Sequence, residues 1–281
     1  MKRVAIVVSV LGAVLALSWY AGCTQQKKSV LLRLKFEPGQ THVFEINRKH
    51  HWMKFNGDSM SAEGTYAIDI TAEEQVRRVL AEGTAEIIQT INRRVYEPRM
   101  GDPNVIDTMV STSTLTLYMH PDGRLADLDF GQSGVKDTAY TRQFYEQAST
   151  VFPKGPVEQG KTWSHSTHVM LNDEKVEAAT TYELKSFARE KGFECAVIAY
   201  DGNLLLPIPP MDGDSTLRQG VDRIDVSGMM YFAYVEGVAV SIRERWLIDS
   251  DRKMVEGGKW KQYRSKVEVD AEQQLVQSVP K

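Results

Sequence analysis

The sequence predicts a mainly β protein made of curved antiparallel sheets or a half-open barrel, with one helix between two halves. Three observations support this prediction. Long segments alternate polar and apolar side chains with a period of two, which is typical of strands with one buried and one solvated face. Short runs of glycine, proline, asparagine and aspartate separate these segments and indicate turns. A single segment, residues 137–152, instead spaces its apolar side chains as a helix does.

The first β-rich half is expected to span residues 30–136. A Pro-Gly pair ends its first strand after Phe36, and Asn56-Gly57 supplies the positive φ values of a tight hairpin turn. Two prolines and a glycine predict a loop over residues 97–107. The expected strands of this half cover residues 30–36, 41–55, 59–71, 84–96, 108–120 and 124–130.

A linking helix over residues 137–152 leads into the second β-rich half, residues 153–272. In the helix, apolar side chains between Phe144 and Val151 recur at helical spacing. Residues 273–281 are expected to form a C-terminal tail. The expected strands of the second half cover residues 163–171, 177–187, 193–206, 222–234, 238–248 and 259–269.

Three short matches between the halves predict an internal duplication. In the first, residues 157–163 resemble residues 36–42, with glutamate, glycine and threonine in register. The alternative is that turn-rich β chains reuse these residue types through composition alone. The other two matches, in the same order along the chain, pair residues 181–184 with 65–68 and residues 246–254 with 117–125.

The N-terminus carries a targeting pattern. Met1-Lys2-Arg3 is followed by an apolar run that ends near Tyr20, and small residues precede Cys23. This pattern resembles the signal of bacterial lipoproteins, although Tyr20 stands where that family prefers leucine. The resemblance implies a signal peptide over residues 1–22, cleavage between Gly22 and Cys23, and lipid attached to the Cys23 thiol. Residues 23–29 then form a short lipidated tether.

Two other interpretations of the N-terminus stay open. The apolar run approaches the roughly 20 residues that cross a bilayer, so an uncleaved span is one alternative. An ordinary secretory signal with an incidental cysteine is the other.

A second resemblance covers most of the chain after Cys23. The segment Phe152-Pro153-x-x-Pro156-Val157-x-x-Gly160-x-x-Trp163, set after a helix, is similar to a group of functionally uncharacterised β-rich lipoproteins of the bacterial cell envelope. This resemblance implies a cell-envelope location facing the periplasm or the exterior, and it implies no chemistry. Thr24, rather than aspartate, follows Cys23, which by the enterobacterial sorting rule favours the outer membrane.

Composition narrows the classes of function. Removing residues 1–22 leaves 32 basic residues, since 34 less Lys2 and Arg3 is 32, against 37 acidic ones, a net charge of −5. A mildly acidic chain does not predict nucleic-acid binding, which calls for a basic stripe or domain. With Cys23 lipidated, Cys195 is a lone thiol on one face of a strand, and we expect it to be a small buried hydrophobe.

The sequence offers no residues for a catalytic or metal site. All six histidines lie between His42 and His168, and adjacent His50 and His51 project to opposite faces of a strand. No third or fourth ligand follows at metal-binding spacing, and no nucleophile elbow or phosphate-binding loop occurs. We therefore expect no metal, no cofactor and no catalytic residue.

One apolar segment is a candidate for binding a ligand or a partner. Its prolines disfavour regular pairing in a sheet. Exposed, it would form a hydrophobic patch; folded back, it would pack on its own domain. The candidate residues are Leu205, Leu206, Pro207, Ile208, Pro209, Pro210 and Met211.

These observations favour a lipid-anchored, non-enzymatic envelope protein whose curved sheet binds a hydrophobic ligand or a protein partner. One alternative is a structural or assembly lipoprotein with a filled core and an outer-surface site. An envelope hydrolase is the third. The interior distinguishes the first two, because a ligand carrier needs a cavity on the scale of a ligand pocket.

Overall fold

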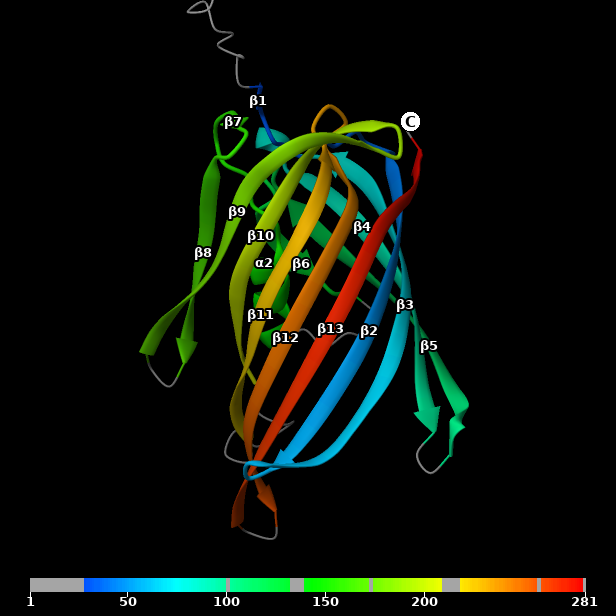
Figure 1. The fold of residues 1–281 in the computed structure, drawn as a ribbon. Helices are drawn as coiled ribbons and strands as arrows, with labels where there is room; N and C mark the ends of the chain where they lie inside the picture. The colour runs from blue at the N-terminus through cyan, green and yellow to red at the C-terminus, as the bar shows by residue number, and fades with distance from the viewer. Residues whose placement is uncertain are drawn as a thin grey trace, which may run out of the picture.

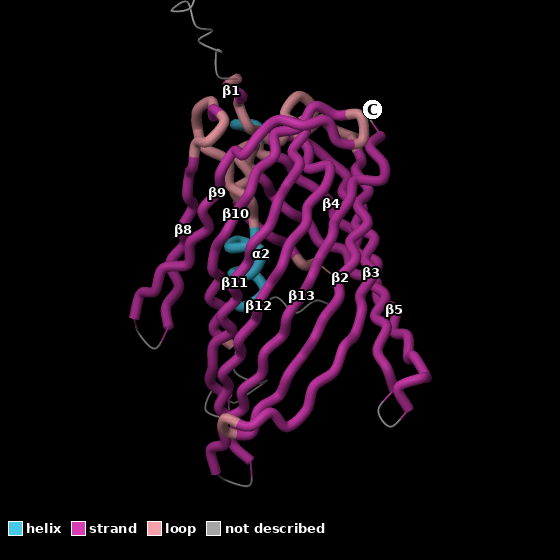
Figure 2. The backbone as a smooth tube through the Cα atoms, viewed as in Figure 1, coloured by secondary structure: helices cyan, strands magenta, loops and turns pink. Residues whose placement is uncertain are grey.

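The computed structural model describes residues 28–99, 102–131, 139–171, 174–208, 218–256 and 259–279. Within these ranges the chain forms one large antiparallel sheet, one α-helix and a two-stranded sheet (Figure 1). Figure 2 shows that strands dominate the whole length of the molecule. In chain order the elements are β1 (Ser29–Val30), β2 (Thr41–Asn56), β3 (Ser59–Val79), the 3-10 turn η1 (Ala81–Gly83), β4 (Ala85–Arg99), β5 (Asp102–Met119), β6 (Leu125–Asp129), α2 (Ala139–Ala148), β7 (Val157–Glu158), β8 (Thr162–Leu171), β9 (Glu174–Glu190), β10 (Phe193–Pro207), β11 (Arg218–Ala233), β12 (Val238–Glu256) and β13 (Lys259–Val279).

The large sheet has 11 strands in the order β6-β5-β4-β3-β2-β13-β12-β11-β10-β9-β8. It curves strongly around α2 but stays open, because β6 and β8 are its two edges and do not pair (Figure 1). The mainly β class, the curved antiparallel sheet and the single helix between two runs of strands are therefore confirmed.

The two halves share one continuous sheet. Strands β2–β6 form one meander and β8–β13 form another, and β2 pairs with β13 from Thr41 opposite Val279 to Phe55 opposite Arg264. The prediction of a C-terminal tail over residues 273–281 is wrong for the part up to Val279. This part is the end of β13 and pairs with the start of β2.

Alternation along the strands separates an inner and an outer face. In β12, Ile242, Trp246 and Ile248 face inward and pack on buried side chains. Arg243 and Arg245 face outward, where they form exposed ion pairs with acidic residues of β13. The period-two pattern in the sequence thus determines which face of the sheet is exposed to solvent.

An N-terminal strap closes one end of the curved sheet. The sequence predicts a strand over residues 30–36, but only Ser29 and Val30 pair, with Glu158 and Val157 of β7. The rest of the strap bridges two turns: Leu34 N–H donates to Pro121 O (2.8 Å) and Lys35 N–H to Gly237 O (3.2 Å).

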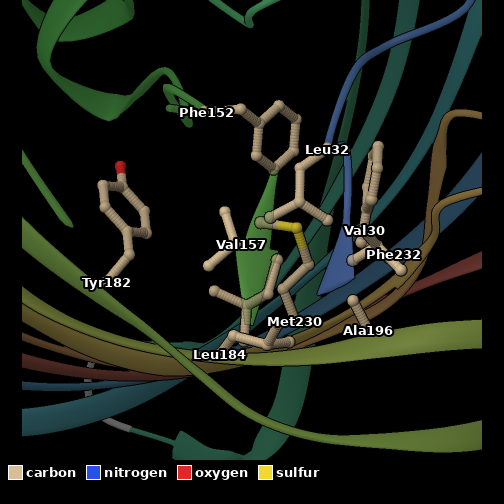
Figure 3. Close-up of a cluster of buried hydrophobic side chains, with 10 residues drawn as sticks. Val30, Leu32, Phe152, Val157, Tyr182, Leu184, Ala196, Met230 and Phe232 are labelled. Carbon is tan, nitrogen blue, oxygen red and sulfur yellow. The ribbon is translucent and has the colours of Figure 1, made fainter. Parts of the chain in front are cut away.

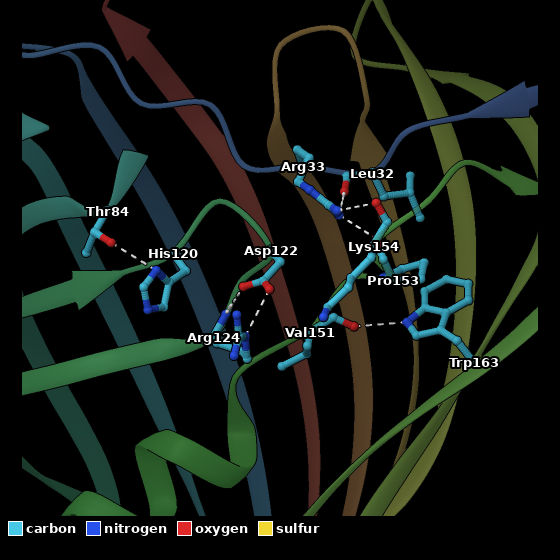
Figure 4. A network of polar contacts seen from close by, with 10 residues as sticks. All are labelled: Leu32, Arg33, Thr84, His120, Asp122, Arg124, Val151, Pro153, Lys154 and Trp163. Atoms are coloured by element: carbon cyan, nitrogen blue, oxygen red, sulfur yellow. Dashed lines mark hydrogen bonds and ion pairs between the residues drawn. The ribbon is translucent and has the colours of Figure 1, made fainter. Parts of the chain in front are cut away.

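The strap is tied to the segment that follows α2. The Arg33 guanidinium donates to three carbonyl oxygens, those of Leu32, Pro153 and Lys154, at 2.5 to 2.7 Å (Figure 4). Beneath these contacts, Leu32 and Phe152 pack with Phe232 in a fully buried cluster (Figure 3). This end of the sheet is therefore filled by a core, whereas α2 covers the inner face below it.

Helix α2 lies against the inner face of the sheet. Phe144 packs against apolar side chains of β10–β12, while Tyr145 packs against the buried cluster of β3–β6. The described helix is shorter than the predicted 137–152, since it ends at Ala148; residues 132–138 lie outside the described ranges. Within those ranges no helix combines the length and hydropathy of a membrane span.

One of the three sequence matches marks equivalent positions in the two halves. Gly39 N–H, in the turn before β2, donates to Val76 O of β3, and Gly160 N–H, in the turn before β8, donates to Leu184 O of β9. The match of residues 65–68 with 181–184 does not mark equivalent positions, because these bonds place Val76, and not Ile68, in the position of Leu184. The match of residues 117–125 with 246–254 pairs a turn with the middle of β12.

Gln147 attaches α2 to the sheet through backbone atoms. Pairing of β10 with β9 stops at Gly202, which leaves Leu205 without a strand partner on that side. The buried Gln147 amide fills this position, because its Nε2 donates to Leu205 O (3.0 Å) and its Oε1 accepts from Leu205 N–H (2.8 Å).

We expect Gln147→Ala to lower the free energy of unfolding by about 2 kcal/mol, because it leaves a buried N–H and a buried C=O without partners. Urea denaturation followed by circular dichroism measures the change. The control is Glu146→Ala, which removes an exposed side chain of the same helix. Equal stability of the two variants would show that the Leu205 contact does not hold the helix.

Candidate ligand-binding site

The inner face carries a cavity of about 320 Å³ between α2 and the sheet. The seam between β2 and β13 forms its floor, since His50 stands opposite Val269 and Trp246 of β12 stands opposite the same valine. Ligand pockets usually measure about 300–1,000 Å³, so this cavity lies at the small end of that range. Its lining side chains are Arg48, His50, Tyr140, Phe144, Asp222, Ile224, Trp246, Ile248, Ser250, Arg252, Ser265, Val267 and Val269.

The middle of the cavity is apolar. Phe144 of α2 lies over Trp246, with ring centroids 5.8 Å apart, and the side chains of Ile248 and Val267 continue the same surface across β12 and β13. Each methylene of a ligand placed here would gain about 0.8 kcal/mol from leaving water.

At one polar end of the cavity the Asp222 carboxylate is satisfied internally, whereas Arg252 Nε is buried without a hydrogen-bond partner among the described residues. Asp222 is almost completely buried, and its carboxylate accepts a hydrogen bond from the Tyr140 hydroxyl (2.9 Å). Arg252 Nη2 also donates to both Asp222 oxygens, at 3.3 and 3.4 Å. This network joins β11 and β12 to α2 and fixes the position of the helix.

The other polar end is dominated by Arg48. Its guanidinium lies 5.6 Å from the centroid of the Trp246 ring, a cation–π distance. Burial lowers the pKa of Arg48, and the nearby Arg93 lowers it further, whereas Glu244 raises it. Among the described residues no hydrogen-bond acceptor or carboxylate contacts the Arg48 guanidinium.

Glu244 is held by neutral donors instead. The Tyr200 hydroxyl donates to one carboxylate oxygen (2.5 Å) and Trp246 Nε1 to the other (3.0 Å). Gly228 makes room for the first bond, because a Cβ there would lie 2.5 Å from the Tyr200 hydroxyl oxygen. Burial and then Glu244 raise the pKa of Tyr200, so its hydroxyl stays protonated and donates.

His50 is a neutral member of the same wall. Its ring stacks on Tyr66 with centroids 4.3 Å apart and an interplanar angle of 11°, and both ring nitrogens are buried without a partner. Burial, followed by the charges of Arg48 and Arg93, lowers the pKa of His50 to about 4. The imidazole therefore adds no positive charge to the cavity at neutral pH.

A second hollow lies on the outer face, at the base of the β4–β5 hairpin. It measures about 570 Å³, and Tyr96, Pro98 and Ile106 form its apolar part. Ile106 and the nearby Met109 and Val110 are more than half exposed. The hairpin therefore presents apolar side chains to solvent.

The apolar segment that the sequence suggests as a binding site is not an exposed patch in its described part. Leu205, Leu206 and Pro207 are the end of strand β10, and Ile208 follows it; the three aliphatic side chains are buried. Leu206 packs in the cluster under α2, so the described part of this segment is core rather than an exposed patch. The remaining candidates, Pro209, Pro210 and Met211, lie outside the described residues, as do Gly22 and Cys23.

Other expectations can be compared directly with the structure. Cys195 is a buried free thiol, as expected, and burial raises its pKa to about 11. His50 faces Tyr66, whereas His51 pairs with Glu63 in an exposed contact, so the two rings do project to opposite faces. No group of three potential metal ligands occurs among the described residues.

Sequence reasoning did not identify Arg48 and His50 as cavity residues. A signal was present, because the even-numbered positions of β2 share one face and two apolar residues, Phe44 and Ile46, precede Arg48 on it. A cation that follows apolar residues on the inner face of a strand is a candidate for a binding role.

We expect His50→Phe to make the protein less sensitive to acid. The folded protein holds His50 neutral to about pH 4, whereas an unfolded chain protonates histidine near pH 6.5, so stability is lost as the pH falls through this window. Between pH 7 and 4 the wild type should lose about 2 kcal/mol more of its unfolding free energy than the variant.

Urea titrations at a series of pH values measure this difference. His51→Phe, on the outer face of the same strand, is the control for loss of an imidazole. If the His50→Phe variant loses stability as steeply as wild type below pH 6.5, burial of His50 has no role in acid sensitivity.

Comparison with known protein families gives no match to this chain. No curated protein matches it either.

Proposed function

We propose that this chain is a lipid-anchored, non-enzymatic protein of the cell envelope, facing the periplasm or exterior, that binds a hydrophobic ligand in the cavity beneath α2. The observation that carries the proposal is a cavity of about 320 Å³ on the inner face of an open sheet, with an apolar middle between two polar ends. Its volume lies within the usual range of ligand pockets, and an apolar surface flanked by a few polar groups is the usual lining of such pockets.

The lining supports binding rather than catalysis. Among the described residues, neither Ser250 nor Ser265 hydrogen-bonds to a base, and the Asp222 network is already satisfied by Tyr140 and Arg252. Among the described lining groups, those with free capacity include the apolar surfaces, the Arg48 guanidinium, Arg252 Nε and the two ring nitrogens of His50. For this reason, the hypothesis of an envelope hydrolase is the least favoured.

The membrane anchor rests on the N-terminal pattern that ends at Cys23. Each acyl methylene that enters the bilayer contributes about 0.8 kcal/mol, so two or three chains hold a protein that one chain would hold only marginally. Thr24 after the cysteine favours the outer membrane as the site of attachment.

A structural or assembly role is the second candidate. The apolar side chains of the β4–β5 hairpin favour it, since Ile106 and Val110 stand exposed on the outer face and Ile106 lines the hollow there. Exposed apolar clusters of this kind often mark protein interfaces. In this case the inner cavity would be a packing defect, with no affinity for ligands.

Native mass spectrometry tests the main proposal on the chain from Thr24 to Lys281, which keeps every described strand and helix. We expect a bound mass, or uptake of envelope lipids when they are offered. Val267→Phe fills the cavity and should weaken binding by about tenfold or more. Leu247→Phe, on the outer face of β12, is the matched control and should bind as wild type does.

Two results would count against a ligand-binding role. One is a clean apo protein that takes up no lipid. The other is equal binding by the Val267→Phe variant and the Leu247→Phe control. Either result would shift attention to the outer hairpin, where chemical crosslinking would identify a protein partner.

For the anchor, we expect Cys23→Ser in the whole chain to abolish lipid attachment, because serine offers no thiol for the thioether. Fractionation and intact-mass measurement should then show an unprocessed chain without acyl chains. A Cys23→Ser protein that remains in the membrane fraction at the mass of the processed wild type would contradict lipidation at this residue.

A further inference from the structure

The cavity contains a positive charge to which the described residues give neither a hydrogen bond nor an ion pair. Arg48 is half-buried, it lines the cavity, and its guanidinium is within hydrogen-bonding distance of no described acceptor. The carboxylate that acts on it most strongly, Glu244, uses its two oxygens to accept bonds from Tyr200 and Trp246. A charge in such surroundings is costly unless an opposite charge or an acceptor completes it.

The surroundings hold Arg48 in a position suited to a ligand. Its guanidinium rests near the face of Trp246, the same ring that forms part of the apolar floor. His50 beside it is neutral at pH 7 and does not compensate the charge. Arg93, exposed on β4, acts electrostatically on both Arg48 and His50 and so adds positive potential to this side of the cavity.

An apolar surface adjoins this charge directly. Val269 lies beside His50 in the paired strands, and Phe144, Ile248 and Val267 extend the surface away from Arg48. A ligand that satisfies both parts needs an acidic group next to a hydrocarbon chain. Guanidinium binds carboxylate and phosphate oxygens in a fork, with two parallel hydrogen bonds.

We propose that the cavity selects amphipathic anions, and that Arg48 is the residue that determines this specificity by binding the acidic head group. The inference rests on the proposed function and adds the chemical class of the ligand. A fatty-acid carboxylate and a phosphate ester of a lipid share the chemistry required. At the opposite polar end, Arg252 is already paired with the buried Asp222 carboxylate through Nη2, and only its Nε lacks a partner among the described residues.

The test compares probes of equal chain length that differ in head-group charge. Dodecyl phosphate, dodecanoate, dodecanol and dodecyltrimethylammonium are titrated into the chain from Thr24 to Lys281, with inorganic phosphate as a probe without a tail. We expect the two anions to bind about tenfold or more tightly than dodecanol, the cation to bind weakest, and inorganic phosphate not to compete.

Variants at residue 48 assign the preference to its side chain. Arg48→Met keeps an unbranched chain against Trp246 without the charge, and it should bind anions and dodecanol about equally. Arg48→Lys keeps the charge without the fork and should keep part of the preference. Lys49→Met, an exposed residue on the outer face, removes the same charge elsewhere and should leave the preference unchanged.

Each alternative result has a distinct meaning. If all tailed probes bind equally and Arg48→Met changes nothing, the specificity proposal is overturned while the ligand-binding function stands. Competition by inorganic phosphate would show that the head group binds by itself, which contradicts selection of an amphipathic molecule. If no probe binds wild type, the proposed function itself fails. Thermal unfolding of each variant confirms that the changes do not come from misfolding.

Discussion

The pairing of β2 with β13 is the contact on which the rest of the architecture depends. These are the first and last long strands of the chain, and their ladder from Thr41–Val279 to Phe55–Arg264 joins two meanders into one sheet. Without it each meander would have one more open edge and no shared inner face. The ladder also brings Arg48 next to Trp246, although the two residues belong to opposite halves of the chain.

In a sheet that curves without closing, the apolar inner face must be covered and the unpaired backbone groups must find hydrogen-bond partners. The strap through Leu34 and Lys35 fills one end with core side chains, and α2 covers the face below it. Gln147 satisfies backbone atoms of β10 that β9 does not reach. Where neither the strap nor α2 fills the inner face, a cavity remains. The lining of this cavity changes from aliphatic at Ile248 to cationic at Arg48. The candidate site is thus the part of the interior that the fold leaves unfilled.

Local signals in the sequence predicted much of the fold and little of the site. Period-two alternation and the turns at Gly57 and Gly123, both with positive φ, follow from residue type alone. The loop expected over residues 97–107 is mostly strand, because β4 has only β5 as a neighbour beyond Tyr96 and a proline is tolerated at such an edge. The cavity could not be predicted, since it depends on which distant strands pair and in what register, and local patterns carry no information about that.

Both ends of the described chain lie at the same pole of the molecule. Ser29 enters the strap there, and Val279 stands opposite Thr41 at the start of β2 (Figure 1). Strands of 16 to 21 residues then run toward the opposite pole, which at about 3.3 Å per residue is roughly 50 to 70 Å of strand. A membrane that holds the chain by Cys23 would therefore meet the filled, strap-covered end. The β2–β3 and β12–β13 hairpins would stand farthest from the lipid, as the part of the molecule that reaches across the surrounding space.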